Sequence, residues 1–198
     1  MKSEKSNKLF FKDIKKISSF SVLLSISVVI YIIESIYLPA LPIPGAKMGL
    51  ANIITFILLA FFTPLACMFN TIFRIILGSL VMGSLFTPTF LISISAGVIS
   101  TLVMIITYKI MFGKVSFIGV SLMGSLFHNS TQMLVASYII SSSGILIYLP
   151  LLLLIGSIFG FLNGWLGNVI VERIAFFWDN SLVTKNKEGQ KWREEVLR

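Results

Sequence analysis

Long apolar runs separated by short polar or proline-rich breaks dominate the chain. Six of these runs are apolar over most of the surface of a helix, which is typical of membrane spans rather than of half-buried surface helices. A membrane β-barrel is disfavoured, because its strands would alternate apolar and polar residues over about ten positions. The sequence therefore predicts an all-α integral membrane protein, a bundle of six transmembrane helices over residues 17–37, 49–62, 65–82, 89–111, 116–140 and 145–174.

The breaks between the runs have the composition of turns. Residues 38–48 read LPALPIPGAKM, and three prolines make this segment extended and stiff, because each fixes φ and restricts the residue before it. Residues 83–89 read GSLFTPT, and residues 141–144 are a short polar link. Each break predicts a connection between neighbouring spans.

Composition and charge agree with this reading. Hydrophobic residues make up 56% of the chain and charged residues only 12%, too few polar groups to cover a soluble domain. With six spans, fourteen of the sixteen Lys and Arg residues fall on one side, as the positive-inside rule predicts for cytoplasmic flanks beside anionic lipid. We expect a basic cytoplasmic tail (1–16), a membrane domain (17–174) and a charged cytoplasmic tail (175–198), and no nucleic-acid partner despite the net charge of +8.

Polar residues within the spans fall on single helical faces. An ionisable group in hydrocarbon is costly, so residues of this kind usually face the bundle interior. The first span carries Ser27, Tyr31 and Glu34, the second Asn52 and Thr55, the third Asn70, Arg74 and Gly78, and the fifth Ser121, Gly124, Ser125, His128 and Gln132, with Asn129 and Thr131 beside them. These stripes predict a polar interior.

Two interpretations of the stripes stay open. In the structural one, Arg74 pairs with Glu34, and His128, Asn129 and Gln132 bridge helices by hydrogen bonds. In the functional one, the polar groups line a cavity that holds a ligand. The candidate substrate-binding residues are Glu34, Lys47, Gly49, Asn52, Asn70, Arg74, His128, Asn129 and Gln132.

The segment from Pro44 to Gly49 is the most informative break. A proline and glycines just before a helix leave backbone N–H groups at its positive end, and Lys47 adds a full charge. Together with Arg74, this favours an anionic or strongly polar ligand that enters from outside. The alternative is an ordinary helix start in which Lys47 extends to the membrane interface.

Small residues recur at four-residue spacing on three spans. Gly156, Gly160 and Gly164 form a ridge on the sixth, Ser93 and Gly97 on the fourth, and Ser21 and Ser25 on the first. Such ridges allow close helix contact, by default within the bundle and otherwise with a partner protein. The lone Cys67 lies in an apolar run and is expected to pack as a small hydrophobe.

Several kinds of chemistry have no motif here. The chain lacks a GxxxxGK[ST] phosphate loop, so we expect no ATP hydrolysis. Its only aspartates, Asp13 and Asp179, lie outside the spans, so no aspartate-rich motif is available to hold Mg²⁺ on a diphosphate. We predict no catalytic residue, no metal site and no cofactor.

Four stretches of the sequence carry a family resemblance. They are PIPGAKMGLANIITF (42–56), FRIILGSLVMGSLF (73–86), GVSLMGSLFHNSTQ (119–132) and the glycine ridge of the last span. Over residues 21–174 the chain resembles the Gx transporter family, whose members are also described as heptaprenyl diphosphate synthase component I. The positions that match the family's polar and glycine pattern are Pro44, Gly45, Lys47, Gly49, Asn52, Arg74, Gly78, His128, Asn129 and Gln132.

The resemblance implies two different functions. The family is similar to the substrate-binding S components of energy-coupling factor (ECF) transporters, six-helix proteins of the bacterial cytoplasmic membrane that work with a coupling membrane protein and two ATPases. It would then make this chain the solute-binding part of an uptake system, with Ser21 and Ser25 as the candidate docking face for the coupling protein. The alternative is a non-catalytic membrane subunit of a prenyl diphosphate synthase, with a soluble synthase subunit as its partner.

Overall fold

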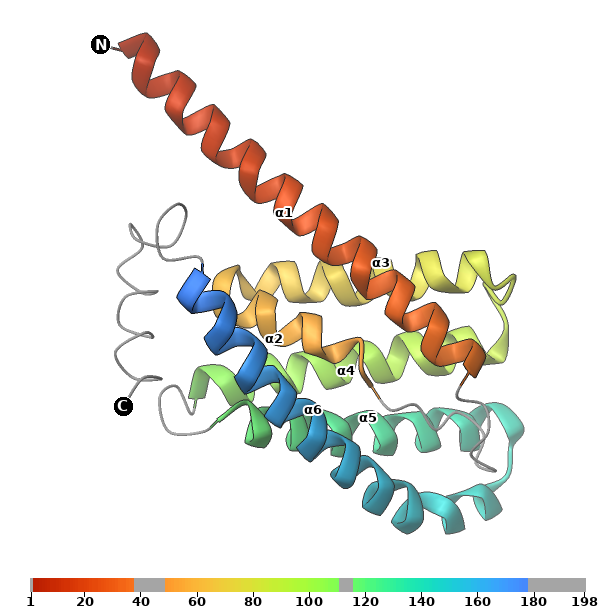
Figure 1. The fold of residues 1–198 in the computed structure, drawn as a ribbon. Helices are drawn as coiled ribbons and strands as arrows, with labels where there is room; N and C mark the ends of the chain where they lie inside the picture. Colours follow the sequence, from red (N-terminus) through yellow and green to blue (C-terminus); the bar gives the residue numbers. More distant parts are fainter. Residues whose placement is uncertain (1, 38–48, 111–115, 178–198) are drawn as a thin grey trace.

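The computed structural model describes residues 2–37, 49–110 and 116–177, and these residues form a helical bundle (Figure 1). Within them there are six α-helices and one short 3₁₀-helix, and no strand. The elements are α1 (Lys2–Tyr37), α2 (Asn52–Phe61), α3 (Pro64–Val81), α4 (Pro88–Ile110), α5 (Phe117–Ile140), η1 (Ser143–Tyr148) and α6 (Leu149–Phe177). The all-α class and the count of six agree with the sequence-based prediction.

Most helix ends lie within a few residues of the predicted spans. The proline-rich segment 38–48 and residues 111–115, between the main parts of the fourth and fifth predicted spans, lie outside the described residues. Three differences remain: α1 begins at Lys2 rather than near residue 17, α2 begins at Asn52 rather than 49, and η1 precedes α6. Helix α2 begins after Gly49 because Gly49 has a left-handed backbone, with φ of +74°. A residue in this conformation cannot be part of a right-handed α-helix.

Four helices in the described residues are long and apolar enough to cross a membrane. They comprise residues 16–36, 64–81, 88–110 and 143–175. Helix α2, with ten residues, is too short to span. Large apolar side chains such as Val29, Leu77 and Ile106 are exposed, whereas Arg74, Asn70 and Gln132 are buried. This inside-out distribution suits hydrocarbon better than water as the surrounding medium.

The described helix ends sort to the two ends of the bundle (Figure 1). The end of α6 lies at the same end of the bundle as the connection from α2 to α3, the end of α4 and the start of α5, and α1 extends beyond the bundle on that side. The last turn of α1, the turn between α3 and α4, and η1 lie at the opposite end. Helix α2 begins part-way along the bundle and runs toward the α6 end.

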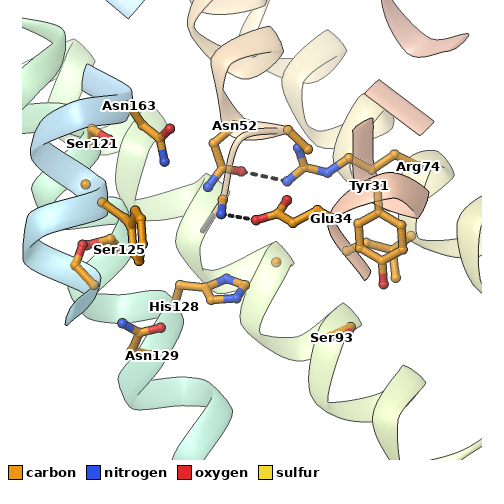
Figure 2. Close-up of a pocket in the computed structure, with 17 residues that line it drawn as sticks. Tyr31, Glu34, Asn52, Arg74, Ser93, Ser121, Ser125, His128, Asn129 and Asn163 are labelled. Carbon is orange, nitrogen blue, oxygen red and sulfur yellow. Dashed lines mark hydrogen bonds between the residues drawn. The ribbon is translucent and has the colours of Figure 1, made fainter. Parts of the chain in front are cut away.

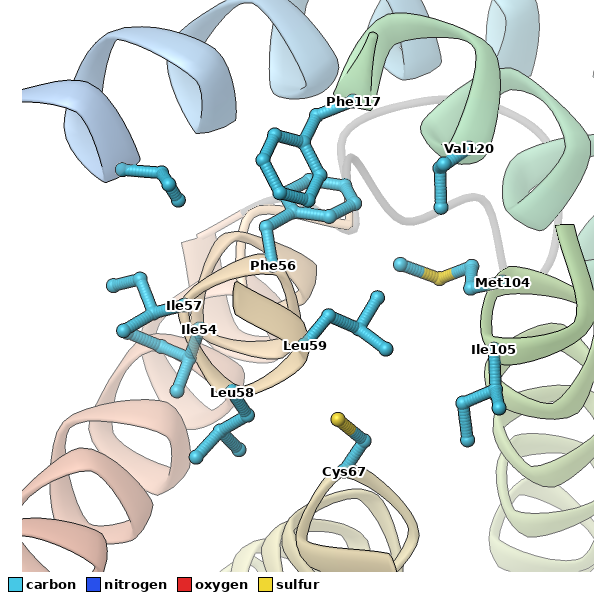
Figure 3. Close-up of a cluster of buried hydrophobic side chains, with 11 residues drawn as sticks. Ile54, Phe56, Ile57, Leu58, Leu59, Cys67, Met104, Ile105, Phe117 and Val120 are labelled. Atoms are coloured by element: carbon cyan, nitrogen blue, oxygen red, sulfur yellow. The ribbon is translucent and has the colours of Figure 1, made fainter. Parts of the chain in front are cut away.

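A hydrophobic core surrounds α2 (Figure 3). Phe56 and Leu58 are fully buried, and they pack with Cys67 of α3, Met104 of α4 and Phe117 of α5. Cys67 therefore packs as a small apolar residue, as the sequence predicted. This core fills the part of the bundle beyond the first turns of α2, so the polar residues that start α2 lie at its edge.

Glycines bring α6 into close contact with its neighbours. A methyl group built on Gly164 would lie 2.4 Å from the Cα atom of Ile118, and one on Gly160 would lie 2.8 Å from the hydroxyl of Ser125. On α4, Gly97 meets Ile75 of α3 in the same way. Both ridges therefore serve packing within the bundle, which was the default interpretation.

Candidate functional site

A cavity of about 50 Å³ lies between the helices (Figure 2). This is room for a few water-sized groups. Every α-helix contributes to its wall: Tyr31 and Glu34 from α1, Gly49, Ala51 and Asn52 at the start of α2, Arg74 and Ile75 from α3, Ser93 and Gly97 from α4, Ser121, Ser125, His128 and Asn129 from α5, and Gly156, Phe159, Gly160 and Asn163 from α6. The polar stripes of separate helices thus converge on one space.

Arg74 is the buried cation of this wall, among the residues that the structure describes. Its side chain is 6% exposed, and its Nη2 donates a hydrogen bond of 2.7 Å to Oδ1 of Asn52. Nε and Nη1 have no hydrogen-bond partner among the described residues. Unpaired N–H groups of a buried cation cost free energy, so the guanidinium has binding capacity that the described protein groups leave unused.

Glu34 supplies the second charge. Its carboxylate is 3% exposed and accepts a hydrogen bond from the backbone N–H of Gly49 through Oε1. Gly49 is two residues before Ala51 and three before Asn52, so Glu34 and Arg74 bind the same turn of chain from α1 and α3. Figure 2 shows the Glu34 carboxylate beside this turn, with the Asn52–Arg74 bond next to it.

The start of α2 therefore faces the cavity. The residue before the helix, Ala51, makes no side-chain cap to its first turn, and the partial positive charge of a helix start acts over its first turn. A ligand with an acceptor group would meet both this end and Arg74. The left-handed conformation of Gly49 is what turns the chain into this position.

Helices α5 and α6 build the opposite wall by interlocking polar side chains with backbone carbonyls. Asn129 donates a hydrogen bond of 2.9 Å to the carbonyl of Leu152, and Ser125 donates one of 2.8 Å to the carbonyl of Gly156. Gly156 is needed for this contact, since an added methyl group would lie 1.9 Å from Nδ2 of Asn129. The amide and hydroxyl of these residues are thus fixed in position while they line the cavity.

The structure brings six of the nine candidate binding residues together. Glu34, Gly49, Asn52, Arg74, His128 and Asn129 all line the cavity. Asn70 lies elsewhere: it is fully buried and donates 3.3 Å to the hydroxyl of Ser27. Gln132 is 4% exposed and does not line the cavity, and its Oε1 has no hydrogen-bond partner among the described residues. Lys47 lies outside the described residues.

The candidate docking pair on α1 is exposed. The hydroxyls of Ser21 and Ser25 donate hydrogen bonds of 3.0 and 2.9 Å to Ile17 and Ser21 carbonyls of their own helix. Both side chains are therefore satisfied locally, on a face where Val22, Ile26 and Val29 are also exposed. Their role in docking stays a prediction.

Sequence reasoning missed Asn163 and Phe159 of α6. Both line the cavity, and Asn163 is 4% exposed. The available signal was an amide at i+3 from Gly160 and i+7 from Gly156, on the same face as the glycine ridge. The glycines drew attention to packing, although the same face also carries the amide to the cavity.

Comparison with known proteins now adds a family. The sequence model of the family described as heptaprenyl diphosphate synthase component I matches residues 23–170. The chain belongs to this family. The match covers most of the chain and includes the residues of all six α-helices that line the cavity. No curated protein and no solved structure matches the chain.

The description of the component I family raises the question of whether the chain has the metal-binding carboxylates of a prenyl diphosphate synthase. A prenyl diphosphate synthase that uses Mg²⁺ requires carboxylates to hold the metal. In the described part of this family member, no three His, Cys, Asp or Glu side chains lie together in a way that could hold a metal ion. The residues that line the cavity instead carry one guanidinium, one carboxylate, one imidazole, amides and hydroxyls.

Proposed function

We propose that this member of the component I family is a substrate-binding membrane component, similar in role to an S component of an ECF transporter. Its cavity would take up a small polar or anionic solute, such as a vitamin or cofactor precursor, from the outer face of a bacterial cytoplasmic membrane. Both termini would lie in the cytoplasm. A separate coupling membrane protein and its ATPases would supply the energy.

The unused hydrogen-bonding capacity of Arg74 carries this proposal. A purely structural arginine would have its donors hydrogen-bonded, because each buried donor left without a partner costs free energy. Nε and Nη1 of Arg74 instead have no partner among the described residues, at the wall of a polar cavity. A ligand with an acid group would pair them, and intramembrane ionisable residues of this kind commonly mark substrate pathways.

The geometry around Arg74 supports selective capture rather than passage. All six α-helices contribute to the cavity wall, and the volume is small. Asn129 and Ser125 are fixed by bonds to α6, and Asn52 is fixed by its bond to Arg74. Preorganised donors and acceptors lower the entropy cost of binding.

The test compares what the purified protein retains. Native mass spectrometry of the full chain released from detergent should detect a bound small molecule in the wild type and its loss in Arg74→Gln. The matched control is Arg173→Gln, the same change at an exposed position near the end of α6, which should keep the molecule. Equal retention by the wild type and both variants would rule out Arg74 as the binding residue.

A second candidate function follows from the family description: a non-catalytic membrane subunit of a prenyl diphosphate synthase. Family membership favours it, and its partner would be a soluble synthase subunit with aspartate-rich motifs. Affinity purification from the native host distinguishes the two. A coupling membrane protein and ATPases in the eluate support uptake, whereas a soluble synthase whose prenyl product depends on this chain supports the subunit role.

A further inference from the structure

The charges in the cavity wall balance. Among the described residues that line the cavity, Arg74 carries a positive charge and Glu34 a negative one, and these two charges offset each other; His128 adds an imidazole. The remaining polar groups are amides and hydroxyls, which can both donate and accept hydrogen bonds. A ligand with a large net charge of either sign would therefore enter a low-dielectric site that compensates only part of it.

The two charged side chains bind one turn of the chain. Glu34 binds the N–H of Gly49, and Arg74 binds the side chain of Asn52. The backbone N–H of Asn52 in turn donates a hydrogen bond of 2.9 Å to the carbonyl of Gly49. The carboxylate of Glu34 and the guanidinium of Arg74 therefore bind the two ends of a single hydrogen-bonded turn. Figure 2 shows both side chains reaching this turn from α1 and α3.

The volume of the cavity further limits the ligand groups that fit. A space of about 50 Å³ holds a few water-sized groups. This suits one acid group with one neighbouring amine, whereas a diphosphate with its bound cation and that cation's water ligands is larger than a few such groups.

We propose that the ligand group bound in this cavity is zwitterionic, with an acid group facing Arg74 and a protonated amine facing Glu34. The inference rests on the proposed function and specifies its substrate class. Glu34 then sets specificity: it attracts the amine and repels ligands that carry only negative charge. A diphosphate is excluded by the same carboxylate.

Three small probes test this assignment on the full chain in lipid nanodiscs. L-alanine carries an acid and an amine, propionate is the same skeleton without the amine, and inorganic diphosphate is a polyanion. Binding is measured from the rise in unfolding temperature with probe concentration, since a ligand that binds only the folded state stabilises it. We expect L-alanine to bind at least about tenfold more tightly than propionate, because a hydrogen bond to a charged group is worth that factor or more.

The variant Glu34→Gln keeps an acceptor for the N–H of Gly49 and removes the charge. In this variant the affinities for L-alanine and propionate should differ by no more than about a factor of two to three. The reason is that the amine of L-alanine loses its hydrogen bond to a charged group. Glu172→Gln, the same change at an exposed position on α6, should keep the wild-type ratio. If Glu34→Gln does not fold, the ranking of the three probes on the wild type decides the matter alone.

Other outcomes overturn the assignment. Tighter binding of diphosphate or propionate than of L-alanine would overturn it, as would an unchanged ratio in Glu34→Gln or no stabilisation by any probe. The proposed function is judged separately, by whether a co-purified molecule is lost in Arg74→Gln. A molecule lost in that variant but lacking an amine would leave the binding function standing and remove the zwitterion.

Discussion

Nη2 of Arg74 donates a 2.7 Å hydrogen bond to Oδ1 of Asn52, and this bond joins the middle of α3 to the first residue of α2. Helix α2 begins part-way along the bundle, and the first backbone N–H groups of a helix have no partner within the helix itself. Arg74 from one side and Glu34 from the other hold this turn in place. The site and the start of the short helix are therefore one structural unit.

The first prediction concerns this bond. Asn52→Ala removes the acceptor and should lower the free energy of unfolding by about 1.5–3 kcal/mol, the range for hydrogen bonds to charged groups. A double-mutant cycle with Arg74→Gln measures the coupling energy between the two residues, with each free energy of unfolding taken from a denaturant titration in detergent. The two substitutions should be non-additive. Additive costs would mean that the Arg74–Asn52 bond contributes nothing to stability.

The helices themselves were predictable from the sequence. Span length is set by the thickness of the hydrocarbon layer, so an apolar run between polar breaks gives a helix within narrow limits. The runs at 65–82 and 89–111 correspond to α3 (Pro64–Val81) and α4 (Pro88–Ile110). Thr63 explains why α3 begins at Pro64. Its hydroxyl accepts a hydrogen bond of 3.2 Å from the backbone N–H of Ala66 and so caps the N-terminus of the helix.

The membership of the cavity was only partly predictable. Helical spacing identifies the face of a helix but not the depth at which a residue meets its neighbours. Asn70 shares a face with Arg74 yet bonds to Ser27, and Gln132 shares a face with His128 yet lies off the cavity. Asn163 enters the wall because glycines let α6 approach α5, a tertiary effect that no single-helix pattern encodes.

The second prediction concerns Gly78 of α3, which lies against the ring of Tyr31. A methyl group on Gly78 would lie 2.4 Å from Cδ1 of Tyr31. Gly78→Ala should therefore cost about 1–3 kcal/mol of unfolding free energy, the usual range for overpacking. Removing the ring should remove the clash, so Gly78→Ala should cost nothing further in a Tyr31→Ala background. An equal cost in both backgrounds, measured by thermal unfolding, would contradict the contact.

The third prediction concerns the start of α5. Asn168 of α6 accepts a hydrogen bond of 3.0 Å from the backbone N–H of Phe117, an otherwise unpaired donor in the first turn of α5. Asn168→Ala should cost about 1 kcal/mol, as for loss of a helix cap. Asn168→Asp keeps the acceptor and places a negative charge at the helix start, where it is favourable. Hydrogen exchange at Phe117 should accelerate in the first variant only, and equal acceleration in both would disprove the cap.

The fourth prediction uses two glycines one turn apart on α6 as a matched pair. A methyl group on Gly164 meets only backbone: Cα of Ile118 at 2.4 Å and the carbonyl oxygen of Phe117 at 2.8 Å. On Gly160 the nearest atom is the hydroxyl oxygen of Ser125 at 2.8 Å, which can rotate away, and the next two, Cβ of Ser125 at 3.2 Å and Cα of Leu122 at 3.4 Å, are milder contacts.

Backbone cannot move without separating α5 from α6, whereas a rotated serine hydroxyl gives up its bonds to the carbonyls of Gly156 and Leu122. Gly164→Ala should therefore cost about 3 kcal/mol or more, at the upper end for overpacking, and Gly160→Ala about 1–2 kcal/mol, the value of one or two neutral hydrogen bonds. Denaturant titration of both variants in the same detergent gives the two free energies. If Gly160→Ala proved as costly as Gly164→Ala, the difference between backbone and side-chain neighbours would not govern how α6 packs on α5.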